Sequence, residues 1–516
     1  MFMSRLVLAG VALALAACTA PPKPPRLQLQ PAASGPKAVP QRNVTHFAEG
    51  LRCMDDMLYR LGVRDVSVMI EELQDQSHRL GGGTRDMMVS AFADMTRRSR
   101  GVRLVTFGQD NQNVVQLLSL AQRANEFKVV PQYDIRGSIT QFDEDVGHQQ
   151  SGIGASLVSA ITGPLFGLRL NRAVQDSVLG FDASVVATAD LSLVPGASSK
   201  NTVVVSREES GASDGQAHIR NSSLSFGFSV GRNEGLAQAL RNMVELSAIE
   251  LTGKLLRLPY WTCLNIDPGQ SEIQREMEDW FLSMRGGAEL PRFFQEQLRN
   301  RRFYDGPMDG RPNEAYAAAL AAYRDALGVQ GTGEPDFAVW QAFLLRPIPA
   351  PPAQPFANAR AAAASASGAA IGLSLKLARP RLRAGEPVEL VVSTTQPGYV
   401  YCYVQIPSTG KIQRIFPNRF VRDAHVEANT PLALPGRQGF RIVASATGAK
   451  AQAFACLAAP REVYNELPPP LRWGDFEDIR LGSFEEIRDT FAQVGQAPVA
   501  LEVAAVEVID GTPAGD

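Results

Sequence analysis

A cysteine near the start of the chain carries the clearest chemical signal in the sequence. Cys18 ends the tetrapeptide Leu15-Ala16-Ala17-Cys18, which closes an apolar run from Leu6 to Ala17 that follows a positive charge at Arg5. A charged residue, a short apolar segment and small residues before a cleavage site are typical of an export signal. The sequence therefore predicts that residues 1–17 are removed and that the thiol of Cys18 receives a lipid, as in a bacterial lipoprotein.

The apolar run is too short to cross a bilayer, because a spanning helix needs roughly 20 apolar residues. No other uninterrupted apolar stretch of that length follows, so we expect a chain that is anchored rather than threaded. The alternative is a cytoplasmic protein whose apolar start happens to end in cysteine. Thr19 follows the cysteine, and by resemblance to enteric lipoproteins the absence of Asp there favours the outer membrane. We therefore expect lipid anchoring in the outer membrane, with the folded domains in the periplasm.

The other four cysteines allow three disulfide connectivities. Cys53 and Cys263 flank one candidate domain, whereas Cys402 and Cys456 lie inside another. Because disulfides persist in export compartments, the positions favour bridges 53–263 and 402–456. Free buried cysteines are the alternative.

Residue types that carry out catalysis are present but not clustered in the sequence. Gly81-Gly82-Gly83-Thr84 lacks the Gly-Lys-Ser/Thr of a nucleotide loop, so we expect a turn and a helix cap there. Asp305 and Asp309 lie in a loop that the local fold explains. The histidines show no spacing for zinc or for a catalytic triad; they are His46, His78, His148, His218 and His425. We therefore expect no enzyme activity, no cofactor and no metal.

Composition divides the chain into several units. At roughly 150 residues per domain, 516 residues correspond to about three folding units. Segments 18–43 and 346–370 are rich in Pro and Ala and are expected to form a tether and a linker. A weaker break near Asp267-Pro268-Gly269 separates two further regions. The net charge of −2 comes from scattered charges and indicates no nucleic-acid partner.

The resulting prediction is a multidomain α+β protein with domains at 44–266, 270–345 and 371–510. In the first, apolar runs predict helices packed on a mixed sheet. The expected strands are 66–71, 102–107 and 133–142, and the expected helices are 114–124 and one that Thr84 caps.

Strict alternation marks the segment 217–230. Leu224, Phe226, Phe228 and Val230 share one face, and small polar residues occupy the other. With 202–207, this segment predicts a hairpin. Alternating apolar and polar residues suit a lipid-facing strand of a membrane barrel, and equally an ordinary amphipathic strand.

The first domain resembles the curli secretion channel family, which also includes holdfast-anchoring lipoproteins. The matching motifs are VSVMIEELQD (66–75), GSITQFDEDV (137–146), SGIGA (151–155) and the helix that contains Ser247-Ala248-Ile249-Glu250. The resemblance implies a homo-oligomeric ring in the outer membrane whose subunits each contribute two hairpins, near 143–178 and 201–231, to one β-barrel. Such a channel passes unfolded or fibre-forming polypeptides without nucleotide hydrolysis.

The sequence departs from that family in two places. The segment 74–84 is shorter than the family loop that narrows the pore, and it lacks aromatic residues. The first hairpin region carries Asp143, Glu144, Asp145 and His148, which belong outside lipid or inside a lumen.

Residues 294–344 resemble the three-helix peptidoglycan-binding domain. The resemblance rests on Tyr304, Gly306, Asp309, Gly310 and Trp340 within a longer motif. It implies peptidoglycan as a partner, although the same residues would also hold together a spacer or protein-binding module.

The C-terminal unit resembles a β-rich domain of unknown function from bacterial envelope proteins, through the segment 384–418. Strands are expected at 373–377, 387–393, 399–406 and 498–508, with a helix at 484–491. Two functions fit the whole chain: an outer-membrane export channel for secreted surface polypeptides, tethered to the cell wall, or a non-conducting scaffold that anchors a surface structure.

Overall fold

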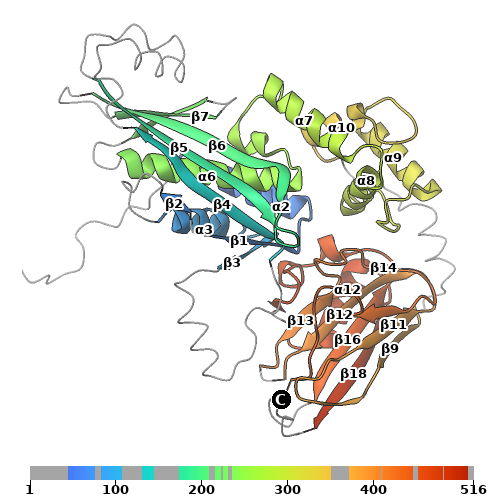
Figure 1. Ribbon diagram of the computed structural model, residues 1–516. Coiled ribbons are helices and arrows are strands. Elements are labelled where there is room, and N and C mark those ends of the chain that lie inside the picture. Colours follow the sequence, from blue (N-terminus) through green and yellow to red (C-terminus); the bar gives the residue numbers. More distant parts are fainter. Residues whose placement is uncertain are drawn as a thin grey trace, which may run out of the picture. The chain divides into compact units, whose positions relative to one another are not determined.

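The computed structural model describes most of the chain from residue 45 onward, and Thr45–Asp516 form one compact unit. The described residues are 45–71, 73–75, 83–106, 131–143, 174–208, 215–221, 225–230, 235–349, 371–407, 409–445, 451–479 and 481–509. Cys18, the expected signal peptide and the expected tether lie outside them. Three regions follow one another in the chain: the sheet domain (45–266), the helical domain (271–345) and the β domain (371–509) (Figure 1). The expected mixture of helices and sheets in several domains is confirmed.

The sheet domain is built on one mixed sheet with the strand order β3-β1-β4-β5-β6-β7-β8, and β2 pairs with β4. β1 is parallel to β3 and β4, and β4 to β8 form an antiparallel meander. The strands expected at 66–71, 102–107 and 133–142 are confirmed as β1, β3 and β4. The bounds are β1 Val66–Ile70, β2 Gln74–Asp75, β3 Val102–Thr106, β4 Tyr133–Asp143, β5 Val174–Ala187, β6 Leu193–Glu208, β7 Gly215–Asn221 and β8 Ser225–Val230.

Helices α2 (Ala48–Arg60), α3 (Thr84–Met95) and α6 (Gly235–Leu256) belong to this domain. α6 lies along β5 and β6 (Figure 1). Its residue Ile249 is fully buried in the same core as Leu179 and Val203 of those strands. One detail of the prediction is wrong: Thr84 begins α3 but does not cap it. Gly83 holds the cap position with φ of 105°, a left-handed conformation that costs glycine little. The helix expected at 114–124 lies outside the described residues.

The helical domain contains α7 (Ser271–Met284), α8 (Glu289–Asn300), α9 (Glu314–Leu327) and α10 (Phe337–Leu345). The last three correspond to the expected three-helix domain, and α7 precedes them. Its core is continuous with that of the sheet domain, since Trp261 of η3 (Tyr260–Leu264) stacks on Trp280 of α7 with ring centroids 5.6 Å apart. The expected break at 267–269 is therefore a bend of the chain within one core.

The β domain combines two sheets and a helix. The larger sheet has the order β10-β18-β16-β12-β13-β17 with β14 beside β12, and the smaller has the order β15-β11-β9. The bounds are β9 Leu373–Leu377, β10 Arg381–Arg383, β11 Leu390–Thr394, β12 Gly398–Gln405, β13 Ile412–Phe416, β14 His425–Val426, β15 Leu432–Leu434, β16 Gln452–Ala459, β17 Asp478–Ile479, α12 Phe484–Gly495 and β18 Ala500–Ile509. The strands expected at 373–377, 399–406 and 498–508 and the late helix are confirmed, while β11 begins later than expected.

β12 lies at the centre of the β domain because both of its faces are covered. Val400 and Val404 pack in a core that includes Leu390 of the smaller sheet. Tyr401 on the other face packs in a second core with Phe491 of α12. The uninterrupted apolar sequence of β12 is typical of a strand buried on both sides.

Two disulfides link distant parts of the chain. Cys53 of α2 bonds to Cys263 of η3, so the first and last elements of the sheet domain are joined. Cys402 bonds to Cys456, its direct partner across β12 and β16. These are the two pairings that the cysteine positions favour.

A buried group of four charges, which we call the clamp, connects the β domain to the sheet domain. It consists of Asp65, between α2 and β1, and of Arg414, Arg419 and Asp475 from the β domain. Arg414 Nη2 lies 2.7 Å from Asp65 Oδ1, and Arg419 Nη2 lies 2.6 Å from Asp475 Oδ1; all four side chains are at most 1% exposed. The N–H of Asp475 also donates to Asp65.

The clamp is electrically balanced, with two guanidinium groups and two carboxylates. Burial alone would raise the pKa of Asp65, but Arg414, Arg64 and the N–H of Asp475 together lower it. The carboxylate of Asp65 therefore stays ionised, and the linker expected at 346–370 does not leave the β domain independent of the rest of the chain.

Replacing Asp65 by Ala should lower the free energy of unfolding by about 3–5 kcal/mol, because Arg414 would remain buried without its carboxylate. Denaturant unfolding of the full chain measures this loss. Asp56→Ala is the control, since Asp56 forms exposed pairs with Arg60 and Arg98 worth about 1 kcal/mol or less. Equal losses in the two variants would contradict the role of the clamp.

Candidate functional site

A pocket lies at one end of the helical domain. Its volume is about 580 Å³, and it lies where three helices begin. Its lining comes from the residues around the starts of α8, α9 and α10, together with the end of α7; they are Phe281, Arg285, Gly286, Gly287, Ala288, Leu290, Pro291, Gly310, Pro312, Glu334, Pro335, Asp336 and Phe337.

One wall of the pocket depends on the loop before α9. The N–H of Gly310 donates to Oε1 of Gln295, which is fully buried on α8. The amide nitrogen of Gln295 donates in turn to Asp309 and to the carbonyl oxygen of Arg311. Gly310 has φ of 75°, and a Cβ there would lie 2.4 Å from the carbonyl oxygen of Ala288. Only glycine allows this close approach of the loop to α8.

A second wall is fixed by Asp336, the N-cap of α10. Its carboxylate accepts a hydrogen bond from the N–H of Val339 and lies 3.2 Å from the guanidinium of Arg324, whose side chain is 2% exposed. Burial alone would raise the pKa of Asp336, but these two partners together lower it. The carboxylate of Asp336 therefore stays ionised at neutral pH, where it is paired with Arg324.

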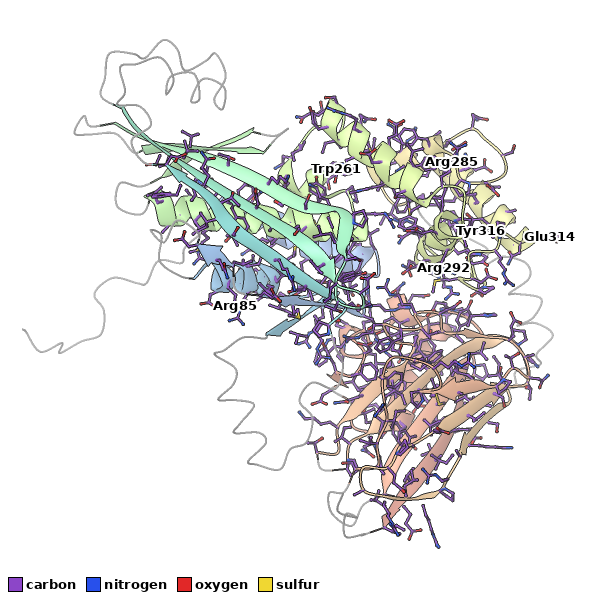
Figure 2. All side chains as sticks on the ribbon, viewed as in Figure 1. Arg85, Trp261, Arg285, Arg292, Glu314 and Tyr316 are labelled. Carbon is purple, nitrogen blue, oxygen red and sulfur yellow. A yellow bond between two sulfur atoms is a disulfide. The ribbon has the colours of Figure 1, made fainter. Side chains whose placement is uncertain are left out.

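The pocket combines aromatic and charged groups. Phe281 and Phe337 meet edge to face, with ring centroids 5.6 Å apart. Arg285 lies on the exposed surface of the helical domain (Figure 2), and Glu334 is also exposed. Small-molecule sites typically have such apolar surface with a few polar groups for orientation. The arrangement suits a ligand with apolar faces and hydroxyl, amide or carboxyl groups.

The motif residues of the expected peptidoglycan-binding domain mostly serve the fold. Only Gly310 and Asp336, which belongs to the longer motif, line the pocket, and Asp309 holds Gln295 beside it. Trp340 is fully buried and donates from its indole N–H to the carbonyl oxygen of Met277 at 2.8 Å. Tyr304 donates to the carbonyl oxygen of Pro307, and Gly306 leaves room for that hydroxyl.

Of the residues expected to share an apolar face, Phe226, Phe228 and Val230 lie on β8, and Leu224 lies outside the described residues. The expectation of one strand over 217–230 is wrong, because the chain forms two strands, β7 and β8, that pair antiparallel with each other. Both strands keep alternation of period two, so a reversal between them leaves the pattern unchanged.

The strand register extends this face across the meander. Phe226 pairs with Ile219, which pairs with Val203 and then Leu179. Directly opposite residues share a face of a sheet, so these apolar residues form one row. Phe228 occupies the next row, with Ala217, Val205 and Ser177.

A buried polar group between α6 and β6 was not predicted. Oε2 of Glu250 accepts hydrogen bonds from Ser199 and Asn201, and the hydroxyl oxygens of Ser199 and Ser247 lie 2.9 Å apart. Glu250 is fully buried. Ser247 and Glu250 stand three residues apart on α6, and this spacing is the signal that could have indicated a shared polar face.

The remaining candidates do not converge. Asp305 and Asp309 bind different partners, Tyr399 and Gln295. His78 and His148 lie outside the described residues, and within the described part no group of three or more His, Cys, Asp or Glu side chains is arranged to hold a metal. No helix in the same part is long and apolar enough to cross a membrane.

The pocket geometry predicts a difference between two glycines that both have positive φ. Gly310→Ala should destabilise the helical domain more than Gly333→Ala, because a Cβ at Gly333 meets nothing within 4 Å whereas one at Gly310 meets the backbone of Ala288. Both variants place alanine in a left-handed backbone conformation, which costs about 1 kcal/mol. The additional loss of stability in Gly310→Ala therefore measures the steric clash. Thermal unfolding compares them, and equal losses would contradict the close approach of the loop.

Comparison with known proteins places only part of the chain in a family. Residues 381–461, from β10 to β16, match a family model described as a domain of unknown function, DUF4384. No curated protein matches the chain. A crystal structure of a Xanthomonas campestris protein described by the family model DUF330 is similar at 10% identity and a TM-score of 0.18, over 39% of this chain and 86% of that chain. This structural similarity is too low to assign a fold, and the family match covers only residues 381–461 of the β domain.

Proposed function

We propose that this chain is a lipid-anchored protein of the outer membrane that forms a homo-oligomeric export channel for secreted surface polypeptides. Lipidation at Cys18 would supply the anchor, and the helical domain would hold peptidoglycan. In this proposal the protein works without catalysis, cofactor or metal. Its supports are the resemblance of the sheet domain to the curli secretion channel family and the topology of the meander.

The main observation behind the proposal is that the two expected hairpins extend from the same end of the sheet. Asp143 at the end of β4 pairs with Val178 of β5, and Glu208 at the end of β6 pairs with Val174. Gln216 near the start of β7 pairs with Ser206. The connections 144–173 and 209–214 therefore leave the same end of the sheet, where one membrane would meet both hairpins.

The proposal assigns Phe226 and Phe228 of β8, at the end of the meander, to lipid, while Leu179, Val203 and Val205 in the same rows pack in the core of the sheet domain. Phe228→Lys should then prevent assembly in the membrane, at about 2–4 kcal/mol for a charge at the midplane. Ser229→Lys, one residue along the strand and on the opposite face, is the matched control. Imaging of detergent-extracted complexes should show rings for the control and none for Phe228→Lys.

Unfolding of the unlipidated chain separates lipid contact from core packing. If Phe228 faces lipid, Phe228→Lys leaves the free energy of unfolding of this soluble form nearly unchanged. A loss of several kcal/mol would instead place Phe228 in the core beside α6 and contradict the lipid-facing assignment.

The helical-domain pocket supports a second part of the proposal, binding of peptidoglycan. Aromatic edges can pack against sugar rings, and Arg285 can donate hydrogen bonds to carboxyl or amide groups of the glycan or its peptide. Arg285→Ala should weaken co-sedimentation with purified cell-wall sacculi about tenfold, the loss expected for one charged hydrogen bond. Arg275→Ala on α7 is the control, since Arg275 pairs with Glu272 at the surface. Equal binding by both variants would remove the pocket from the proposal.

A non-conducting anchoring scaffold is the alternative function, and strand length favours it. β7 has seven residues and β8 has six, whereas a membrane strand needs about 9–11. Monomers or small assemblies without rings, with cell-wall binding retained, would decide for the scaffold.

A further inference from the structure

The junction between the helical domain and the β domain brings together more carboxyl groups than cations. Arg299 of α8 is 2% exposed and binds Asp423 through both terminal nitrogens, at 2.8 Å each. The same guanidinium lies 3.8 Å from Glu462. Asp305, in the loop after α8, adds a third carboxyl group beside this arginine.

Asp305 is held from both sides of the junction. The hydroxyl of Tyr399 on β12 donates to its Oδ1, and the backbone of Glu462 also hydrogen-bonds the carboxyl. His425 meets the ring of Tyr399 edge to face at 5.4 Å. Both of these donors to the Asp305 carboxyl belong to the β domain, whereas Arg299 acts on it through its charge.

Glu462 contributes a buried carboxyl oxygen without a hydrogen-bond partner to the same junction. Its Oε1 accepts a hydrogen bond from Tyr401, but its buried Oε2 has no hydrogen-bond partner in the described part of the chain. Arg299 Nε is likewise buried and unpaired. The electrostatics are thus unlike those of the clamp, where charges of both signs are equal in number.

One guanidinium cannot neutralise three carboxylates, and uncompensated buried charge is expensive. A proton is the cheapest way to remove one negative charge, and the buried carboxyl with the least cationic contact should take it. Asp423 is excluded because Arg299 binds it directly; despite its burial, Arg299 and the N–H groups of Met308 and His425 lower its pKa.

We propose that the junction takes up a proton when the β domain docks on the helical domain, and that the carboxyl group of Asp305 carries it. Docking is thereby coupled to pH, and moderate acid tightens the contact between the two domains. No other covalent change accompanies the step: the proton comes from solvent and returns to it when the domains separate.

The pKa of Asp305 agrees with this assignment in direction. Burial raises it and the charge of Glu462 adds to the rise, whereas the Tyr399 hydroxyl and Arg299 act in the opposite sense. A carboxyl whose pKa is raised by docking stabilises the docked form fully below its ordinary pKa of about 4. That contribution is lost as the pH rises through the raised value. Asp423, with its lowered pKa, weakens the junction only in stronger acid.

Hydrogen exchange at Met308 tests the proposal in the full chain. The N–H of Met308 crosses the junction to Oδ2 of Asp423 at 2.7 Å, so its exchange reports opening of the junction. After correction for the intrinsic pH dependence of exchange, protection should fall several-fold between pH 4 and pH 7.5, since each pKa unit of linkage is worth a tenfold change over the whole titration. Protection that is constant over this range would overturn the proposal.

Two variants and a control identify the carboxyl group that takes up the proton. Asp305→Asn mimics the protonated carboxyl, so its protection should stay high at both pH values. Tyr399→Phe removes a hydrogen bond that lowers the pKa of Asp305, so the loss of protection should move to higher pH. Asp325→Asn, an exposed change on α9, should behave as the parent chain does. If Asp305→Asn keeps the parent's pH dependence, the proton belongs to another group and the proposal fails.

Discussion

Burial of charge is the constraint on which the arrangement of the domains depends. Arg414 and Arg419 are almost completely inaccessible, and the β domain supplies only Asp475 to pair with them in the clamp. Asp65, the carboxylate that completes the balance, comes from a turn in the sheet domain more than 300 residues earlier. Because a buried guanidinium without a partner costs several kcal/mol, the β domain reaches a balanced charge only when it is docked. The docked position in turn places Tyr399 and Glu462 against the helical domain.

The local spacing of apolar residues predicted much of the secondary structure, because buried faces of helices and strands recur with a fixed period in the sequence. β1, β4, α3, α12 and β18 lie where apolar periodicity placed them. The same pattern failed at 217–230, since two short strands alternate just as one long strand does. The turn-forming residues Asn221, Ser222 and Ser223 were the available signal for the reversal.

The pocket, the clamp and the carboxyl-rich junction could not be predicted from local sequence patterns, because they form through contacts between segments that are distant in the sequence. The motif that suggested glycan binding is made largely of residues that hold the helical domain together, such as Trp340 and Tyr304, and only Gly310 and Asp336 of that motif line the pocket. The pocket forms where the starts of α8, α9 and α10 meet, which depends on packing of segments distant in sequence. The clamp and the carboxyl-rich junction join residues from separate domains, and neither Asp65 nor Asp305 differs in sequence from an ordinary loop aspartate. A composition break predicted a linker at 346–370, most of which lies outside the described residues, yet it said nothing about whether the domains on either side are in contact.

The disulfide between Cys53 and Cys263 has a mechanical consequence. It joins the chain a few residues after the described part begins to the last turn before the helical domain. A pulling force applied between the N-terminal end and the helical domain would pass through this covalent bond, and the whole sheet would lie on a side branch that carries no tension. Such a molecule can serve as a link under load while the strands of the meander keep their pairing.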